Sequence, residues 1–110
     1  MNKNGFRKLL SYGHDQMLAL TASKGEEYSG GDDQLANFKR YAAAAGISLE
    51  QAWLVLFMKH IDAISSHART GVVLSEPIDG RIDDAMLYLH LYRAIVWEKL
   101  DPTKTDILPC

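Results

Sequence analysis

Hydrophobic residues recur at helical spacing along nearly all of this chain, and strand-like alternation is almost absent. Four segments carry apolar residues three or four positions apart, which is the spacing of one face of an α-helix. The β-like triplet Val72–Leu74 is too short to form a sheet by itself. The pattern therefore predicts a single all-α domain over residues 1–110, a four-helix bundle with its core at about 6–100 and a poorly ordered tail at 101–110.

Glycines and capping residues mark the first two helices. The first helix is predicted over residues 6–23, and a polar, glycine-rich connection follows over residues 24–31. The second helix is predicted to begin at Asp32 or Asp33, since either residue suits the N-cap position, and to stop at Gly46. Its expected buried stripe consists of Leu35, Phe38, Ala42 and Ala45.

The third helix has a clear start and an unusual composition. Ser48 and Gln51 are spaced as a capping box, so this helix is predicted to begin at Ser48 and to run to about Ala68. One apolar side is expected to face the core, and a second apolar side carries Leu54, Met58 and Ile61. Helices that are apolar around most of their circumference are normally surrounded by protein. The sequence therefore predicts a homo-oligomer, a dimer or a larger assembly.

The fourth helix places a carboxylate among apolar residues. Pro77 suits the first helical position, which makes Glu76 the expected N-cap of a helix that runs to Leu100. At about 100° per residue, Asp84 falls on an apolar side of this helix. Its neighbours on that side are Tyr88, Leu91 and Ile95. A carboxylate in such surroundings is costly unless it is hydrogen-bonded, paired or bound to a metal, so Asp84 is the first candidate for a functional residue.

The other acidic residues have two interpretations each. Asp79 and Asp83 lie near the start of the fourth helix, where acids favour the helix dipole in solvent, but carboxylate oxygens there also suit a hard cation such as Mg²⁺. Glu27 either belongs to a solvated turn or meets Asp84 across the bundle as a metal-binding pair.

The third helix carries two histidines and a lysine, and each of them has two possible roles. His60 and His67 are seven residues apart, whereas two zinc-binding histidines on one helix are usually four apart. We therefore expect hydrogen-bonded interior or interface histidines. Lys59 either forms a surface ion pair with Asp62 or faces a phosphate.

Composition limits the partners and the compartment. With 12 basic and 14 acidic residues, the formal net charge is −2, which gives no support to general nucleic-acid binding. No apolar run approaches the ~18 residues of a membrane-spanning helix, and the first residues lack a signal-peptide core. Cys110 is the only cysteine, so an internal disulfide and a cysteine-based metal site are excluded. These features predict a cytoplasmic protein that does not bind membranes.

Several polar motifs occur in an order that resembles a set of small bacteriophage and prophage proteins, with similarity over about residues 14–98. The motifs are Lys24-x-x-Glu27-Tyr28-Ser29, Asp32-Asp33-x-x-x-Asn37-Phe38-Lys39-Arg40, Lys59-His60-x-Asp62-Ala63-Ile64 and Ser75-Glu76-Pro77-Ile78-x-x-Arg81-Ile82-x-Asp84-x-x-x-Tyr88. These proteins are similar to nucleotide-modification-associated phage domains. More remotely, they resemble the all-α nucleoside-triphosphate pyrophosphohydrolases of the MazG and dimeric dUTPase types.

The resemblance implies an oligomeric helical protein of the host cytoplasm that binds a (deoxy)nucleoside phosphate, with Mg²⁺-assisted hydrolysis as a further activity. Carried over residue by residue, it implies catalytic roles for Glu27 and Asp84. The implied Mg²⁺ ligands are Glu27, Glu76 and Asp84. The implied substrate-binding residues are Lys24, Asn37 and Lys59.

An alternative function stays open at this point. The pyrophosphohydrolases carry an E-x-x-E pair on one helix and E-x-x-D on another, whereas this chain has Arg81 three residues before Asp84. Relatives also often show D-x-x-N-Y, and Leu87 stands in place of that asparagine. The second hypothesis is a non-enzymatic, oligomeric interaction or adaptor protein in which Asp84 has a structural role.

Overall fold

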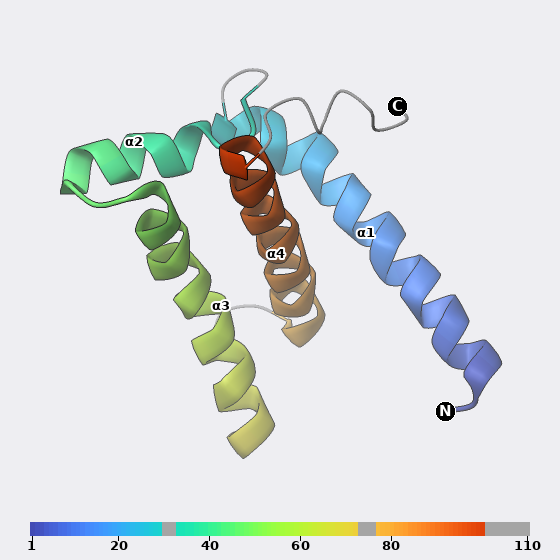
Figure 1. Ribbon diagram of the computed structural model, residues 1–110. Coiled ribbons are helices and arrows are strands. Elements are labelled where there is room, and N and C mark those ends of the chain that lie inside the picture. Colours follow the sequence, from blue (N-terminus) through green and yellow to red (C-terminus); the bar gives the residue numbers. More distant parts are fainter. Residues whose placement is uncertain (30–32, 73–76, 101–110) are drawn as a thin grey trace.

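The described part of the chain consists of four helices and contains no strand. The structure is a computed structural model that describes residues 1–29, 33–72 and 77–100, with the side chains of residues 23–29 outside the description. The helices are α1 (Lys3–Ser29), α2 (Ala36–Ala45), α3 (Leu49–Thr70) and α4 (Ile78–Leu100) (Figure 1). Within these residues the all-α, four-helix prediction is confirmed. The predicted tail, the residues Val73 and Leu74 of the β-like triplet and the Glu76 cap lie outside the described residues.

The helices differ in how closely they pack. α3 and α4 contact each other more extensively than any other pair, α2 packs on α3, and α1 contacts α4 and α2. Figure 1 shows α2 crossing one end of the molecule and the N-terminal half of α1 diverging from α4. The α3/α4 interface therefore has the most extensive packing with which this fold can hold the side chains of a functional site in place.

The first helix is longer than the sequence predicts. The expected connection at 24–31 is wrong for residues 24–29, because α1 continues through Ser29. Lys24, Glu26 and Glu27 all favour helix, and no proline interrupts them. The single Gly25 costs about 1 kcal/mol relative to alanine, which an already formed helix tolerates.

The second helix begins with a turn that Asp33 organises. A side-chain oxygen of Asp33 accepts a hydrogen bond from the Leu35 amide at 2.9 Å, and its carbonyl accepts one from the Ala36 amide at 3.1 Å. The helix therefore begins a few residues later than predicted. Gly46 ends it in the left-handed conformation, with φ of 68°, as predicted. Ala45 is exposed, contrary to the predicted stripe, because this end of α2 extends beyond α3 (Figure 1).

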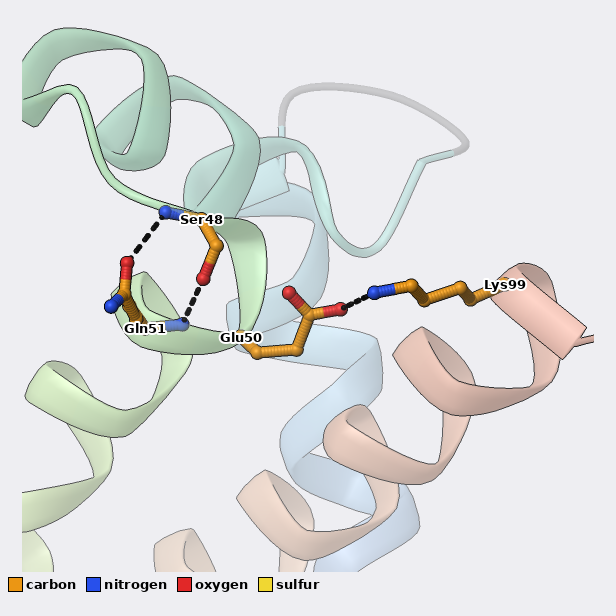
Figure 2. Close-up of polar contacts among 4 residues, drawn as sticks. All are labelled: Ser48, Glu50, Gln51 and Lys99. Atoms are coloured by element: carbon orange, nitrogen blue, oxygen red, sulfur yellow. Dashed lines mark hydrogen bonds and ion pairs between the residues drawn. The ribbon is translucent and has the colours of Figure 1, made fainter.

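The third helix begins at the predicted capping box. The Ser48 hydroxyl accepts a hydrogen bond from the Gln51 amide at 3.1 Å, and the Gln51 side-chain oxygen accepts one from the Ser48 amide at 2.9 Å (Figure 2). The helix ends two residues later than predicted, at Thr70, and Gly71 closes it with φ of 75°. Figure 2 also shows Glu50 paired with Lys99 of α4 at 3.2 Å, a solvent-exposed contact that contributes little stability.

Removing the cap should have a measurable cost. Ser48→Ala leaves an amide of the first turn of α3 without its side-chain acceptor, so we expect the free energy of unfolding to fall by about 1 kcal/mol. Urea denaturation followed by circular dichroism measures this change. Ser65→Ala is the matched control, since Ser65 is exposed in the middle of α3. Equal effects of the two substitutions would show that the capping box does not stabilise α3.

The fourth helix begins one residue later than predicted. The carbonyl of Pro77 accepts the hydrogen bond of the Gly80 amide at 3.1 Å, so Pro77 is the last residue before the helix. Helical residues on one side of α4, including Ala85 and Ile95, are buried. Ile95 packs in the core cluster that contains Trp53 of α3.

An aromatic core fixes α3 against α4. The buried cluster consists of Leu35, Phe38, Trp53 and Ile95. The Trp53 ring lies 4.7 Å from Phe57 and 4.5 Å from Tyr92, measured between centroids. Its indole N–H donates to the carbonyl oxygen of Tyr88 on α4 at 2.7 Å. These contacts fix the position of α4 along α3. They therefore also fix which part of α3 lies opposite Asp84, one turn before Tyr88 on α4.

Candidate functional site

Asp84 lies at the α3/α4 interface, as the helical phase of the sequence predicts. Its side chain is 13% exposed, and it shares a side of α4 with the half-buried Tyr88 and the fully buried Ile95. The prediction that Asp84 lies on an inward side of α4 is therefore confirmed. The question is which groups compensate its charge.

Two basic side chains of the described residues, His60 and Arg81, lie near Asp84. His60 of α3 is 5% exposed, and its Nδ1 lies 3.9 Å from Oδ2 of Asp84. Nη1 of Arg81 lies 3.5 Å from the same Nδ1, and the edge of the His60 ring packs against the Tyr88 ring at 4.7 Å. We call His60, Arg81, Asp84 and Tyr88 the α3/α4 polar cluster. The expectation of an interior histidine with polar contacts is confirmed at His60.

Nδ1 of His60 lies within reach of both Arg81 and Asp84. A neutral ring with its proton on Nε2 accepts from Arg81 through Nδ1. A protonated ring is attracted to Asp84 and repelled by Arg81. The cluster therefore holds one permanent cation, Arg81, one carboxylate, Asp84, and one imidazole, His60, which can donate or accept a hydrogen bond. Such a set can compensate a buried charge, or bind an anionic group through the guanidinium.

The other predicted site residues are distributed over three helices. Lys24 and Glu27 belong to the last turns of α1, where side chains are outside the description, and Glu76 lies outside it entirely. Asn37 is half-buried on α2, next to Phe38, whose ring contacts Tyr88 at 5.6 Å. Asn37 is therefore adjacent in sequence to Phe38, which contacts Tyr88 of the cluster.

Lys59 does not belong to the cluster. It is adjacent to His60 in sequence, but successive helical residues are about 100° apart, and Lys59 is exposed whereas His60 is buried. Among the described residues, no group of three histidine, cysteine or acidic side chains is arranged to hold a metal ion. Of the predicted Mg²⁺ ligands, only Asp84 has a described side chain.

Two acids precede Asp84 on α4. Asp79 is exposed, and Asp83 is half-buried. Burial raises the pKa of the Asp83 carboxyl above its usual value, and the negative charges of Asp79 and Asp84 raise this pKa further. The first part of α4 is therefore a region where negative charge accumulates without full compensation.

Asp83→Asn should stabilise the protein at neutral pH. Because the pKa of Asp83 is higher in the folded protein than in the unfolded chain, ionisation of this group opposes folding once the pH exceeds the unfolded value. The neutral amide removes that penalty, so we expect the monomeric variant to have a higher melting temperature than the monomeric wild type at pH 7. The difference should disappear in acid, below both pKa values. Melting curves at both pH values check this, and a gain that persists in acid would contradict the electrostatic origin.

The sequence pattern identified Asp84 but missed its neighbours. Arg81 at the i−3 position was a usable signal, since opposite charges at this spacing share a helix face. His60 comes from another helix, and no sequence pattern places it opposite Asp84. The identity of Asp84's neighbours depends on the α3/α4 register.

Comparison with known proteins does not add a family. No family model, curated protein or solved structure matches this chain. Within the described residues, no single helix is long and apolar enough to cross a membrane. Only α2 and α3 taken together reach that length and composition, and the chain bends by 105° between them.

Proposed function

We propose that this protein binds the phosphate groups of a (deoxy)nucleoside phosphate beside the α3/α4 polar cluster. The observation that carries the proposal is the inward position of Asp84, with the guanidinium of Arg81 and the ring of His60 close by. Ligand sites of helical bundles are built from side chains that project between facing helices. A guanidinium is also well suited to phosphate, because its donors match the oxygen geometry. The motif order that resembles the phage nucleotide-modification domains supports the same ligand class.

The proposal assigns roles to the residues that the resemblance implies. Asp84, Glu27 and Glu76 would hold Mg²⁺, which would supply Lewis-acid chemistry for the phosphate groups and for water. The residues Lys24, Asn37 and Lys59 would contact the nucleotide. The stronger form of the proposal is hydrolysis, in which water and a nucleoside triphosphate give a nucleoside monophosphate and pyrophosphate.

Ligand-induced stabilisation tests binding separately from turnover. Purified protein is melted with each common dNTP and Mg²⁺, and pyrophosphate release is measured in parallel. A ligand at about 100 times its Kd stabilises the folded state by about 2.7 kcal/mol, which is a large shift for a domain of this size. We expect a shift with at least one nucleotide. The proposal fails if no nucleotide gives either a shift or turnover.

A matched pair of variants identifies the residue responsible. Asp84→Asn keeps the shape of the side chain but removes its charge, and it should abolish the nucleotide-induced shift. Asp83→Asn makes the same chemical change at the next position, which lies outside the cluster, and it should leave the shift intact. Equal responses of the two variants would remove Asp84 from the site.

A second function is favoured by the cations beside Asp84. If His60 and Arg81 serve only to compensate the buried carboxylate, the cluster is structural, and the protein is a non-enzymatic interaction or adaptor protein. Wild type would then show no nucleotide-induced shift, and Asp84→Asn would only lower stability. Loss of nucleotide binding in a fully folded Asp84→Asn variant would exclude this function.

A further inference from the structure

The apolar face of α1 is covered by the rest of the chain over only part of its length. Phe6, Leu10, Gly13 and Met17 follow one another at the four–three spacing of a helix-packing seam. Met17 is buried, and a Cβ atom built on Gly13 would lie 3.8 Å from Cε of Met86 on α4. Phe6 and Leu10, with Leu9 beside them, are instead 47–55% exposed. The seam on α1 therefore meets α4 at Gly13, but nearer the N-terminus the rest of the chain leaves it exposed.

The facing side of α4 is also uncovered. Ile82 and Leu89 flank Met86 at the same four–three spacing, and they are 40% and 56% exposed. Figure 1 shows why: the N-terminal half of α1 diverges from α4. The two helices therefore leave five large apolar side chains, roughly a few hundred Å² of apolar surface, which is the size at which such patches mark interaction sites.

The charges on the two uncovered faces are complementary. Beside the apolar residues of the N-terminal half of α1 lie the exposed cations Lys3 and Arg7, whereas Lys8 falls on the opposite side of this helix. The start of α4 carries Asp79 and Asp83. No ion pair among the described residues joins these two groups within one chain. The raised pKa of Asp83 indicates that a nearby cation would relieve the local excess of negative charge.

We infer that a second copy of this chain covers these faces, with the N-terminal half of α1 from each copy packed against the N-terminal half of α4 from the other. One chain supplies both the basic apolar face and the acidic apolar face, so a reciprocal arrangement about a two-fold axis satisfies both at once and closes the assembly. The seam residues form the apolar centre of this interface, and the charged residues form its rim. The interface does not depend on nucleotide binding, and neither proposal requires the other.

Mass measurement of the full chain without nucleotide tests the inference. Sedimentation across a wide concentration range should show a reversible dimer of the 12.3 kDa chain. Leu10→Glu should give a monomer with unchanged helix content, because Leu10 is exposed within one chain. Ala43→Glu is the control on α2, where Ala43 is exposed, and it should leave the dimer intact. A wild-type monomer, or equal effects of the two variants, would overturn the proposal.

Charge reversal tests which helices meet. One variant combines Lys3→Glu with Arg7→Glu, and the other combines Asp79→Lys with Asp83→Lys. Each alone should weaken the dimer about tenfold or more, because like charges then face each other. A mixture of the two should regain wild-type affinity, since every contact between copies again joins opposite charges. A dimer that is unaffected by the α4 substitutions, or a mixture that fails to associate, would overturn the pairing of α1 with α4.

Discussion

Replacing Trp53 by alanine is expected to lower the free energy of unfolding by about 3–5 kcal/mol. The Trp53 side chain is buried where α3 meets α4, with aromatic neighbours on both helices. Alanine removes the ring and leaves a cavity between helices that cannot close without shifting. It also removes the donor that satisfies the Tyr88 carbonyl. Urea denaturation at low temperature, followed by circular dichroism, measures the loss.

A second substitution separates the ring from its hydrogen bond. Trp53→Phe retains an aromatic side chain but has no indole N–H to donate to Tyr88. We expect a loss of about 1–2 kcal/mol, from one hydrogen bond and a small reduction in volume. If Trp53→Ala costs less than Trp53→Phe, the packing of Trp53 between α3 and α4 is not the main source of its contribution.

Removing the Asp84 carboxylate is expected to cost about 3 kcal/mol. Asp84→Ala removes the carboxylate whose Oδ2 lies 3.9 Å from Nδ1 of His60 at a largely buried interface, and breaking a buried polar pair in this way is strongly destabilising. The residual exposure of Asp84 places the effect at the lower end of the range for buried pairs. Chemical denaturation at neutral pH gives the value.

The double variant shows whether charge compensation is the cause. Arg81→Met removes the permanent cation while retaining apolar volume, so Asp84→Ala combined with Arg81→Met should be more stable than the sum of the single changes predicts. A coupling of about 1 kcal/mol or more would support compensation between the two residues. Strict additivity would show that Asp84 stabilises the interface by some route that does not involve Arg81.

Local signals in the sequence predicted the end of α2 and the start of α3. The capping box at Ser48 and the stop at Gly46 depend on residues within one turn of each other, so no tertiary information is needed. The extension of α1 to Ser29 was missed because glycine and polar residues resemble a connection. Intrinsic preferences in such a segment are weak, and the helix that precedes it decides the outcome.

The candidate site was predictable only in part. Helical phase alone placed Asp84 on a buried side of α4, because that depends on spacing within one helix. The proximity of His60 depends on how far α3 slides along α4. That register is fixed by the contacts of Trp53, which no pairwise pattern in the sequence reveals. The roles implied for Lys24, Glu27 and Glu76 stay predictions.

The aromatic core has a consequence for how the molecule opens. Its buried cluster and the apolar residues packed against it come from the segment 35–95, so α2, α3 and α4 share one cooperative unit. The N-terminal turns of α1 contribute none of these residues, and an isolated helical segment of that length is only marginally stable in water. In the monomeric chain, amide hydrogens there should exchange through local fraying, whereas those of α3 and α4 exchange only on global unfolding. Hydrogen exchange would then report two opening free energies in one small chain, a low one for the N-terminal turns of α1 and a high one for α3 and α4.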